Sequence, residues 1–420
     1  MEQRLHQIQE IVQTAKQNTP IYQEKYKEID ISNFTWETFQ SLPYLTREEY
    51  RNRAQINDLY CPTEESHYVF ISGGSTGISK ASFWNISDIE IATTTLANTM
   101  KQLHLDNKDR ALNLFTPGMS GTHYCFNRAM EKIGNTIIPL GGDTEWEVLV
   151  RFVQDLNINV LIGNPSTLIL TLEHILNKNP QYKAKTIFYA GENLSQTQYE
   201  FMQQHTEYLH TPIYSSTETG IIGTACPHCQ PGIFHLTKTV HIELLDRNTE
   251  KITQEKQGEI VVTSLLSRSA PCLRYRLGDH VSFLEEMCPC GNSQPLFQLQ
   301  GRTDDAITIG STHWSYDEIT LPLTKHLQEQ KGKISSNYAI QLQQIEHRTQ
   351  MTIQYQPMNA TKQEIETLEE KIEIYMNKEH PIVSPLVKKG ILFSVQVQRI
   401  DNFETLKNPQ TGKIRFVRYI

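Results

Sequence analysis

Residues 160–176 read VLIGNPSTLILTLEHIL, and this stretch decides the fold class. It begins with the apolar run VLI, which predicts a strand. Asn164 is a favourable helix N-cap, and the residues after it predict a helix that extends to about Leu176. The stretch therefore reads as a strand, a cap and a helix.

The same order of signals recurs further along the chain. Residues 186–190, TIFYA, predict another strand, and Ser195 with Gln198 forms a capping-box pattern before another helix. Alternation of this kind implies a parallel-rich sheet covered by helices. Ligands of such sheets bind in the crevice beyond the strand ends. The loops at residues 191–193 and 214–220 directly follow predicted strands, so both are expected to line that crevice.

The pattern changes near residue 301. Alternating apolar residues in 338–342 and again in 351–355 predict a β-hairpin, and apolar residues at helical spacing in 365–375 predict a helix. We therefore expect an α/β fold with two domains. The large N-terminal domain, residues 1–300, has parallel-rich sheets covered by helices, and the small α+β domain comprises residues 301–420.

Composition and charge restrict the class of protein. The 420 residues include 39 Lys and Arg against 47 Asp and Glu, which gives a formal net charge of −8. With no basic stripe interleaved with aromatic residues, this balance disfavours a nucleic-acid partner. No apolar run approaches the length of about 18 residues that a membrane helix needs, and the N-terminus is polar, so neither a membrane span nor a signal peptide is expected. Seven cysteines are too few for a secreted disulfide scaffold, which favours the cytoplasm.

A cluster of glycines and hydroxyl residues ends in a lysine at residues 71–80, ISGGSTGISK. Glycines let the backbone approach oxyanions closely, and successive N–H groups form an anion-binding nest. No Gly precedes Lys80, so the phosphate-binding loop of phosphoryl-transfer NTPases is disfavoured. Taken alone, the segment fits a Gly/Ser-rich surface turn equally well.

Four more motifs follow this cluster in order: YSSTETG at 214–220, YRLGD at 275–279, GRTDD at 301–305 and GK at 412–413. The five motifs together resemble the adenylate-forming superfamily of acyl-CoA ligases and carrier-loading domains, over nearly the whole chain. The segments TPIY at 19–22 and LPYLTR at 42–47, with the compact length, resemble its phenylacetate-CoA ligase branch.

This resemblance implies an AMP-forming acid–thiol ligase. Such an enzyme uses ATP to convert a carboxylic acid, here expected to be an aryl acid, into an acyl-adenylate with release of pyrophosphate. The acyl group then passes to a thiol such as coenzyme A. The enzyme must neutralise a crowded triphosphate and hold the attacking carboxylate in line, and Mg²⁺ is the expected counter-ion.

The resemblance also implies roles for single residues around the phosphates. The residues that cradle the β- and γ-phosphates are Ser72, Ser75, Thr76, Gly77 and Lys80. Glu218 is the expected Mg²⁺ ligand, since Mg²⁺ is commonly held by one or two carboxylates with phosphate oxygens and waters. The alternative for Glu218 is an exposed carboxylate at a helix start.

Other residues are expected around the nucleoside of ATP and AMP. Gly191 and Glu192 resemble the family's adenine-contacting turn, and Tyr214, Ser215 and Thr217 belong to the motif beside it. Asp279 resembles the Asp that accepts hydrogen bonds from both ribose hydroxyls, the alternative being a surface turn after a strand. Arg302 is expected at the ribose and phosphate side, with a catalytic role.

The C-terminal motif supplies the expected catalytic lysine. Lys413 is a compact cation on a flexible stem, and by resemblance it stabilises the charge that develops at the α-phosphate. The alternative is a solvated C-terminal lysine. Asp304 matches the hinge about which the small domain rotates in these families.

Residues 117–124 are expected, by the same resemblance, to face the side chain of the acid. His123 and Tyr124 suit an aromatic or polar acid. A core histidine with a satisfied hydrogen bond is an equally good interpretation of His123.

Four cysteines occur in two closely spaced pairs, CPHC at 226–229 and CPCG at 288–291. Cys226, Cys229, Cys288 and Cys290 offer four thiolates for a closed, tetrahedral, structural zinc site. His228 or His235 could replace one cysteine, because the second pair is one residue shorter than a usual zinc knuckle. Four unlinked thiols are the alternative.

The acceptor of the acyl group is open. After GRTDD the family usually has Ile-x-Gly, whereas this chain has Ser311 at the glycine position. A stand-alone adenylation enzyme that loads an aryl or amino acid onto a phosphopantetheine carrier protein, or onto an amine, is therefore the alternative to a coenzyme A ligase. An inactive ligase body that serves as a zinc-dependent interaction module is a third, different class. Relatives imply a homodimer.

Overall fold

The computed structural model describes the chain except for residues 1, 55–57, 62–67, 73–79, 119–120, 142–143, 192–193, 195, 247–248, 267–268, 303–306, 310–311, 315, 331, 346–347, 407–415 and 420. The chain divides into two compact units. The first unit comprises Met1–Gly163, Ala184–Ala190 and Tyr208–Arg302, and the second comprises Asn164–Lys183, Gly191–Glu207 and Thr303–Ile420.

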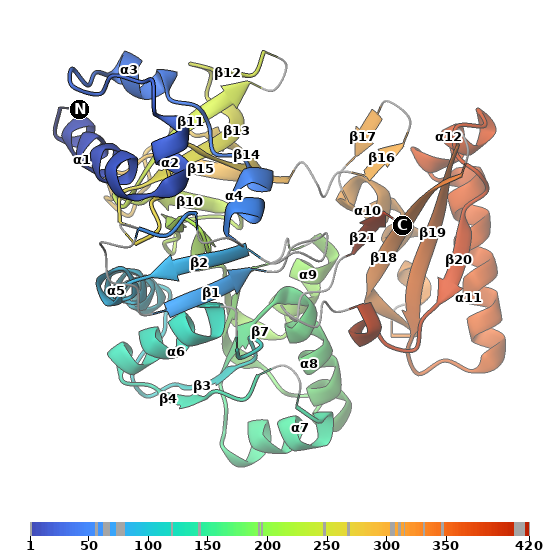
Figure 1. The fold of residues 1–420 in the computed structure, drawn as a ribbon. Helices are drawn as coiled ribbons and strands as arrows, with labels where there is room; N and C mark the ends of the chain where they lie inside the picture. The colour runs from blue at the N-terminus through green and yellow to red at the C-terminus, as the bar shows by residue number, and fades with distance from the viewer. Residues whose placement is uncertain are drawn as a thin grey trace. The chain divides into compact units, whose positions relative to one another are not determined.

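A parallel sheet runs through the middle part of the chain (Figure 1). Its strand order is β4-β3-β5-β6-β7, with β4 Thr136–Ile138, β3 Arg110–Asn113, β5 Val160–Gly163, β6 Ala184–Tyr189 and β7 Thr206–His210. Strand β3 pairs in parallel with β4 and with β5, and β5 pairs in parallel with β6. Every residue of β5 is buried, which explains why its sequence is a continuous apolar run. The strands predicted at residues 160–162 and 186–190 are confirmed.

Helices connect these strands as the alternating pattern predicts. The helices of this part of the first unit are α5 Ile86–Gln102, α6 Gly121–Ile133 and α7 Trp146–Asp155. Phe126 and Met130 of α6 share one buried core with Ala111 of β3 and Val160 of β5. The mixed α/β fold class is thereby confirmed.

An antiparallel sheet follows in the same unit. Its order is β12-β11-β13-β14-β15-β10-β9-β8, with β8 Ile213–Ser216, β9 Gly220–Thr224, β10 Ile233–Leu236, β11 Val240–Asp246, β12 Lys251–Ile252, β13 Gln257–Ser264, β14 Tyr275–Phe283 and β15 Leu296–Arg302. The sequence did not predict this sheet. In the described part of residues 213–302 the strands follow one another without a helix between them, and neighbours in the sheet pair in antiparallel.

The N-terminal segment packs against the antiparallel sheet through Arg274. The helices of this segment are α1 Glu2–Asn18, α2 Pro20–Lys25, α3 Trp36–Ser41 and α4 Arg47–Ala54. The guanidinium of Arg274, whose residue is 1% exposed, donates to both carboxylate oxygens of Glu243 at 2.8 and 2.9 Å and to the carbonyls of Gln40 and Leu42. Its own carbonyl accepts from the N–H of Leu45 at 3.0 Å. Arg274 has a φ of 47°, a conformation that costs a non-glycine residue about 1 kcal/mol or more, so these contacts hold it there.

The second unit contains a sheet with the order β20-β19-β18-β21. Its strands are β18 Ile334–Ile345, β19 Arg348–Pro357, β20 Gln396–Arg399 and β21 Val417–Tyr419. Strands β18 and β19 form the predicted hairpin, with Ile340 opposite Ile353. The further elements of this unit include the helices α8 Pro165–Lys178, α9 Gln196–Gln204, α10 Tyr316–His326, α11 Lys362–Ile374 and α12 Val383–Lys388 and the strands β16 Ile307–Ile309 and β17 Thr312–Trp314. Helices α8 and α11 confirm two predicted helices.

The second unit also buries an acidic group. Glu173 of α8 accepts a hydrogen bond from Ser335 of β18 at 3.3 Å, and both residues are buried. Burial raises the pKa of Glu173 to about 7, and the Ser335 hydrogen bond offsets only part of that shift.

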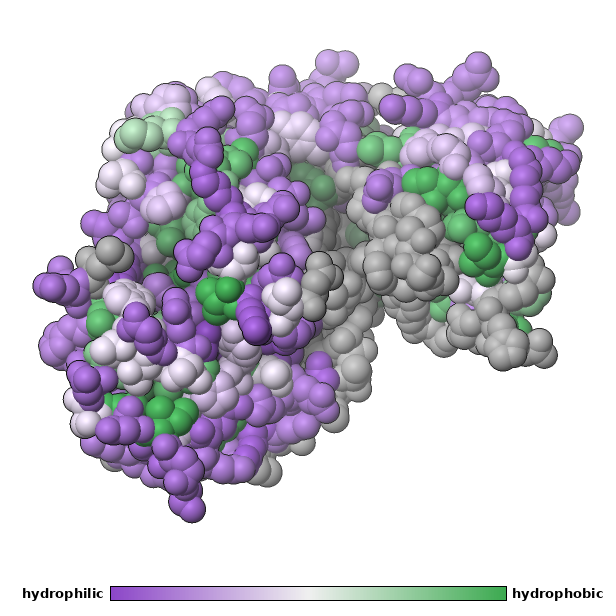
Figure 2. Space-filling model, turned by 90° about the horizontal axis from the view of Figure 1, so that it is seen from above, coloured by the Kyte–Doolittle hydropathy of each residue, from purple (hydrophilic) through white to green (hydrophobic). Residues whose placement is uncertain are grey.

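The molecular face in Figure 2 is mostly hydrophilic, with apolar side chains in small separate groups. Within the described residues, helices long and apolar enough to cross a membrane are absent.

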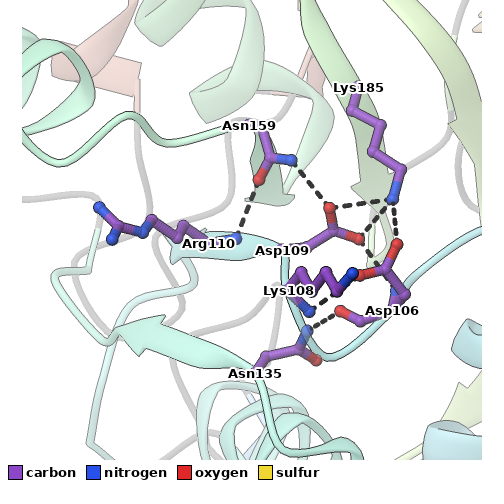
Figure 3. A network of polar contacts seen from close by, with 7 residues as sticks. All are labelled: Asp106, Lys108, Asp109, Arg110, Asn135, Asn159 and Lys185. Atoms are coloured by element: carbon purple, nitrogen blue, oxygen red, sulfur yellow. Dashed lines mark hydrogen bonds and ion pairs between the residues drawn. The ribbon is translucent and has the colours of Figure 1, made fainter.

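A polar network joins the amino ends of three parallel strands (Figure 3). Lys185 of β6 contacts the two carboxylate oxygens of Asp109 at 2.9 and 2.7 Å and one oxygen of Asp106 at 2.9 Å. Asn159, just before β5, donates to Asp109 at 2.8 Å and accepts from the backbone N–H of Arg110 at 2.9 Å. Asp109 is only 3% exposed. The network therefore fixes the strands at the end opposite to the crevice in which ligands of parallel sheets bind.

Replacing Lys185 with Met should destabilise the protein by about 2–3 kcal/mol, because it leaves the buried Asp109 carboxylate without its cation. Thermal or urea unfolding measures the change. Lys183→Met makes the same chemical change at an exposed position two residues away and should have little effect. Equal stability of the two variants would contradict the structural role of the network.

Replacing Glu173 with Gln should stabilise the protein at alkaline pH. The folded state holds the Glu173 proton more tightly than the unfolded chain, because its pKa is about 7 instead of the usual value of about 4.3. The contribution of this group to stability is therefore complete below about pH 4 and is lost as the pH rises to about 7. At pH 8 the variant should gain up to about 3 kcal/mol. The thermal midpoint at pH 5 and pH 8 tests this, with the exposed Glu366→Gln as the control.

Candidate functional site

Two paired strands flank the Gly-rich motif. Strand β1, Tyr68–Ser72, pairs in antiparallel with β2, Lys80–Trp84, and Ser72 lies opposite Lys80. These two residues thus mark the strand ends on either side of residues 73–79. The expected phosphate-binding residues Ser75, Thr76 and Gly77 lie outside the described residues.

Lys80 forms an ion pair with Glu218, although 138 positions separate them in the sequence. Glu218 lies in the turn between β8 and β9, and the two residues are only 9% and 5% exposed. Burial alone would raise the pKa of Glu218. The Lys80 ammonium and the hydrogen bonds to the carboxylate outweigh burial, and the net effect is a pKa below the usual value. Glu218 is therefore an ionised, buried carboxylate, and the alternative of an exposed carboxylate at a helix start is wrong.

Aromatic residues enclose this ion pair. The Tyr275 hydroxyl lies 3.3 Å from Lys80 Nζ and 3.4 Å from Glu218 Oε1. The Tyr275 ring packs against that of Tyr50, with centroids 5.3 Å apart, and Lys80 Nζ lies about 6 Å from each ring centroid. Both rings are buried, so the charges interact in a setting with little water.

Asp279 lies within strand β14 and is 7% exposed, so it is not in a surface turn. The Tyr214 hydroxyl donates a hydrogen bond to Asp279 Oδ2. The Tyr214 ring packs between Phe234 and Phe297, with centroid distances of 5.9 and 5.8 Å. Asp279 also lies opposite Arg302 in the β14–β15 ladder. The two residues expected near the ribose are therefore neighbours, although the Arg302 side chain lies outside the described residues.

The motif at residues 214–220 spans strand β8 and the turn into β9. Ser215 is exposed, and the carbonyl of Thr217 accepts a hydrogen bond from the Trp84 indole at 3.0 Å. Gly220 has a φ of +82°, and a Cβ there would lie 3.3 Å from the Trp84 ring. Glycine is thus needed to keep the hairpin β1–β2 close to this turn.

Several expected site residues lie elsewhere in the chain. Gly191, with a φ of +86°, follows the parallel strand β6 and belongs to the second unit. Glu192, Asp304 and Lys413 lie outside the described residues, so their expected roles stay predictions.

His123 and Tyr124 lie in the first turn of α6. His123 Nδ1 is 2.7 Å from the carbonyl of Phe115, and burial lowers the pKa of His123. The hydroxyls of Tyr124 and Tyr68 are 2.9 Å apart, and the Phe70 ring lies 6.1 Å from that of Tyr124. Burial raises the pKa of Tyr124 to about 12. These aromatic rings and neutral polar groups have the chemistry to orient an aryl ring by packing and hydrogen bonds, with no charged side chain among them.

Cysteines of two turns meet in the structure. The donor atoms of Cys226, His235, Cys288 and Cys290 lie within 4.8 Å of one another. Cys226 Sγ is 3.4 Å from Cys288 Sγ, and Cys290 Sγ is 3.3 Å from His235 Nε2. Three thiols and one imidazole are a donor set that suits tetrahedral zinc.

The structure favours His235 over Cys229 within this set. His235 Nδ1 lies 3.4 Å from the carbonyl of Gln294, which leaves Nε2 available as a ligand, and such an outer hydrogen bond commonly orients a metal-binding histidine. The thiol of Cys229 lies 3.5 Å from that of Cys226, but Cys229 is not a member of the close set of four donors. His228 is exposed and is also not a member.

Sequence reasoning missed two tyrosines of the site. Tyr275 opens the motif at 275–279, so its position was a usable signal, but nothing in the sequence placed its hydroxyl between Lys80 and Glu218. Tyr68 has no motif around it, and only the pairing of β1 with β2 and the packing of α6 reveal it.

No family model matches the chain. Phenylacetate-coenzyme A ligase from Aromatoleum evansii is 23% identical over 369 residues, which cover 83% of this chain and 80% of the relative. The enzyme of the same name from Pseudomonas putida is 24% identical over 329 residues, covering 73% and 72%. Indoleacetate–lysine synthetase from Pseudomonas savastanoi is 24% identical over 263 residues, covering 60% and 62%.

Solved structures share the fold at lower identity. A 2-hydroxyisobutyryl-CoA ligase in complex with 2-HIB-AMP superposes with a TM-score of 0.77 at 17% identity, over 99% of this chain and 88% of that one. An acyl acid amido synthetase superposes with a TM-score of 0.67 at 14% identity, over 98% and 91%. The motif order, the fold and these relatives agree, and together they support placing the chain in the adenylate-forming superfamily, in its phenylacetate-CoA ligase-like branch.

Proposed function

We propose that this protein is an AMP-forming ligase that activates a carboxylic acid with ATP and then passes the acyl group to a thiol, with coenzyme A as the first choice. In the first step a carboxylate oxygen attacks the α-phosphorus of ATP, and the bond to the leaving pyrophosphate breaks. In the second step a thiolate attacks the acyl carbonyl, and AMP leaves. The ligases among the sequence relatives support this reaction.

The observation that carries the proposal is the buried pair of Lys80 and Glu218. Each residue was expected at the triphosphate for a separate reason, one as a cation for phosphate and one as a carboxylate for Mg²⁺. The fold brings them into contact from β2 and from the turn before β9. A buried ion pair is weak support for stability alone, because desolvation offsets much of its attraction, so a binding role is the better explanation.

The remaining roles come from the family resemblance, and the geometry around this pair supports those of the described residues. Glu218 would hold Mg²⁺, which would supply charge neutralisation of the phosphates, and Lys80 would bind a phosphate oxygen. Asp279 accepts from the ribose hydroxyls, and Tyr214 orients that carboxylate through its hydroxyl. Lys413 stabilises the charge at the α-phosphate during adenylation. It acts from residues 301–420, which we propose as the small domain that rotates about Asp304.

We assign the acid to the aryl class. Four side chains of strand β1 and helix α6 supply aromatic faces and three polar groups: Tyr68, Phe70, His123 and Tyr124. Aromatic rings prefer stacked or edge-to-face neighbours, which an aryl acid offers and a short aliphatic acid does not.

The second candidate acceptor is an amine, as in a stand-alone adenylation enzyme. It is favoured by the indoleacetate–lysine synthetase among the relatives and by Ser311 at the position of the usual glycine. A phosphopantetheine carrier protein is a thiol acceptor that leaves the first-step residues unchanged.

We also propose a structural zinc ion held by Cys226, His235, Cys288 and Cys290. The close donor set, the hydrogen bond of His235 to the backbone and the 3.5 Å approach of the Asn292 N–H to Cys290 Sγ all fit a knuckle-type site. Four protein ligands leave no position for substrate, so the ion ties two turns together and does no chemistry.

ATP–pyrophosphate exchange across a panel of aryl, amino and fatty acids, with and without coenzyme A, tests the function. Exchange with aryl acids and faster AMP release with coenzyme A are the expected results. Exchange that coenzyme A does not affect would shift the acceptor to an amine or carrier protein. The absence of exchange with any acid would overturn the proposal in favour of an inactive, zinc-dependent interaction module.

Replacing Lys413 with Ala should lower the rate of acyl-adenylate formation by about 100-fold or more, since it removes a cation that acts only as charge develops at the α-phosphate. The fold should stay intact, as thermal unfolding would show. Lys389→Ala, at an exposed position of the second unit, is the matched control. A wild-type rate in the Lys413 variant would remove this residue from the mechanism.

Replacing Cys288 and Cys290 with Ser should remove zinc and lower the thermal midpoint together, because both thiols belong to the donor set. Elemental analysis of the purified protein gives the zinc content. Cys229→Ser should keep its zinc, whereas His235→Asn should lose it. The reverse result for the last two variants would assign the fourth ligand to Cys229.

A further inference from the structure

The hydroxyl of Tyr275 joins the two members of the Lys80–Glu218 pair. Lys80 Nζ donates to it over 3.3 Å, and it donates to Glu218 Oε1 over 3.4 Å. The three groups form a closed triangle, because Lys80 also contacts the same oxygen of Glu218 directly. Tyr275 is fully buried, so its hydroxyl is well shielded from water.

The backbone on either side of Tyr275 is held firmly. Leu45 forms a parallel bridge with Tyr275, and its N–H and carbonyl bond to Arg274 and Arg276 over 3.0 and 2.9 Å. The preceding Arg274 is fixed by its ion pair with Glu243. The ring of Tyr275 packs on Tyr50, whose own hydroxyl lies 2.9 Å from that of Ser82. The backbone contacts and the packing of the ring on Tyr50 together fix the position of the Tyr275 hydroxyl.

The phenol remains a neutral donor at working pH. The ordinary pKa of a tyrosine hydroxyl is about 10, so the group stays protonated at neutral pH. It can therefore donate to a carboxylate without itself becoming an anion.

We propose that Tyr275 is a positioning residue of the adenylation step, whose hydroxyl holds the Glu218 carboxylate in the metal-binding orientation once Lys80 has turned from Glu218 to the nucleotide phosphates. The inference rests on the proposed function. When Lys80 turns away, Glu218 loses the ammonium that contacts it in the described part of the chain, and the Tyr275 hydroxyl is a donor that can stay in place until Mg²⁺ binds. A buried carboxylate that lacks a partner is costly, and a single neutral hydrogen bond offsets part of that cost.

A positioning role for Tyr275 predicts a change in Mg²⁺ dependence, which the loss of a purely structural contact does not. Replacing Tyr275 with Phe keeps the ring and its packing and removes the hydroxyl. The Mg²⁺ concentration at half-maximal pyrophosphate exchange should then rise by about 10-fold, as expected for the loss of a hydrogen bond to a charged group. The rate at saturating Mg²⁺ should fall far less, because the metal itself then fixes the carboxylate.

Tyr22→Phe is the matched control. The Tyr22 hydroxyl is also fully buried, donates to the carbonyl of Pro271 and accepts from the N–H of Leu273, each over 2.9 Å, yet it does not touch the ion pair. This variant should lower the thermal midpoint at least as much as Tyr275→Phe and should leave the Mg²⁺ dependence unchanged. Incorporation of 4-aminophenylalanine at position 275 restores a donor at the same point and should restore the wild-type Mg²⁺ dependence, which keeps the test valid if the Phe variant does not fold.

Calorimetric titration with ATP, at low and high Mg²⁺, supplies a readout that needs no catalysis. Weaker ATP binding by Tyr275→Phe at low Mg²⁺ alone is the expected result. Wild-type Mg²⁺ dependence in Tyr275→Phe, or an equal shift in Tyr22→Phe, would overturn the inference while leaving the ligase intact. Wild-type protein that neither binds ATP with Mg²⁺ nor exchanges pyrophosphate would instead overturn the proposed function, and the inference with it.

Discussion

The buried ion pair of Arg274 and Glu243 is the constraint on which the rest of the first unit depends. One guanidinium satisfies a carboxylate on β11 and two carbonyls of the N-terminal segment, and the same residue adopts a φ of 47°. Removing either charge would leave the other buried without its counter-charge, at a cost of about 3–5 kcal/mol. Strand β14 begins at the residue after Arg274, so the contacts of Arg274 also fix the positions of Tyr275 and Asp279 on that strand.

The site built on this scaffold gathers charge where water is scarce. Lys80 and Glu218 neutralise each other within an aromatic enclosure, and their attraction compensates for the desolvation of both. Each partner also has the chemistry to bind a different part of a Mg²⁺-nucleotide, since an ammonium suits a phosphate oxygen and a carboxylate suits Mg²⁺. In the proposed ligase, the pair would keep both charges stable in the free protein and let each change partner when the nucleotide binds.

The sequence predicted those parts of the structure whose signals are local. The apolar run at β5 and the periodic residues of β18, β19 and α11 each specify their own element, and the motif order specified the superfamily. The antiparallel sheet escaped prediction, because its short strands read alike whether their partners are near or distant. The contact between Lys80 and Glu218 depends on the hairpin β1–β2 lying close to the turn before β9, which sequence spacing does not encode. The sequence named His235 only as a possible substitute for a cysteine, because the pairing of β10 with β15 that brings it beside Cys290 is not encoded in sequence spacing.

The residues proposed for the nucleotide and those proposed for zinc lie at opposite ends of the same strands of the antiparallel sheet. Glu218 lies just before β9 and Cys226 just after it, while the β14–β15 hairpin carries Asp279 opposite Arg302 at one end and the turn with Cys288 and Cys290 at the other. His235 lies on β10, between β9 and β15 in the sheet. A slip of one residue in these ladders would shift a strand by about 3.3 Å and turn its side chains to the other face. A zinc ion that joins the far turns would forbid that slip. The proposed metal site would then act on the chemistry from a distance, by holding the strand register that places Glu218 and Asp279 for their proposed contacts with the nucleotide.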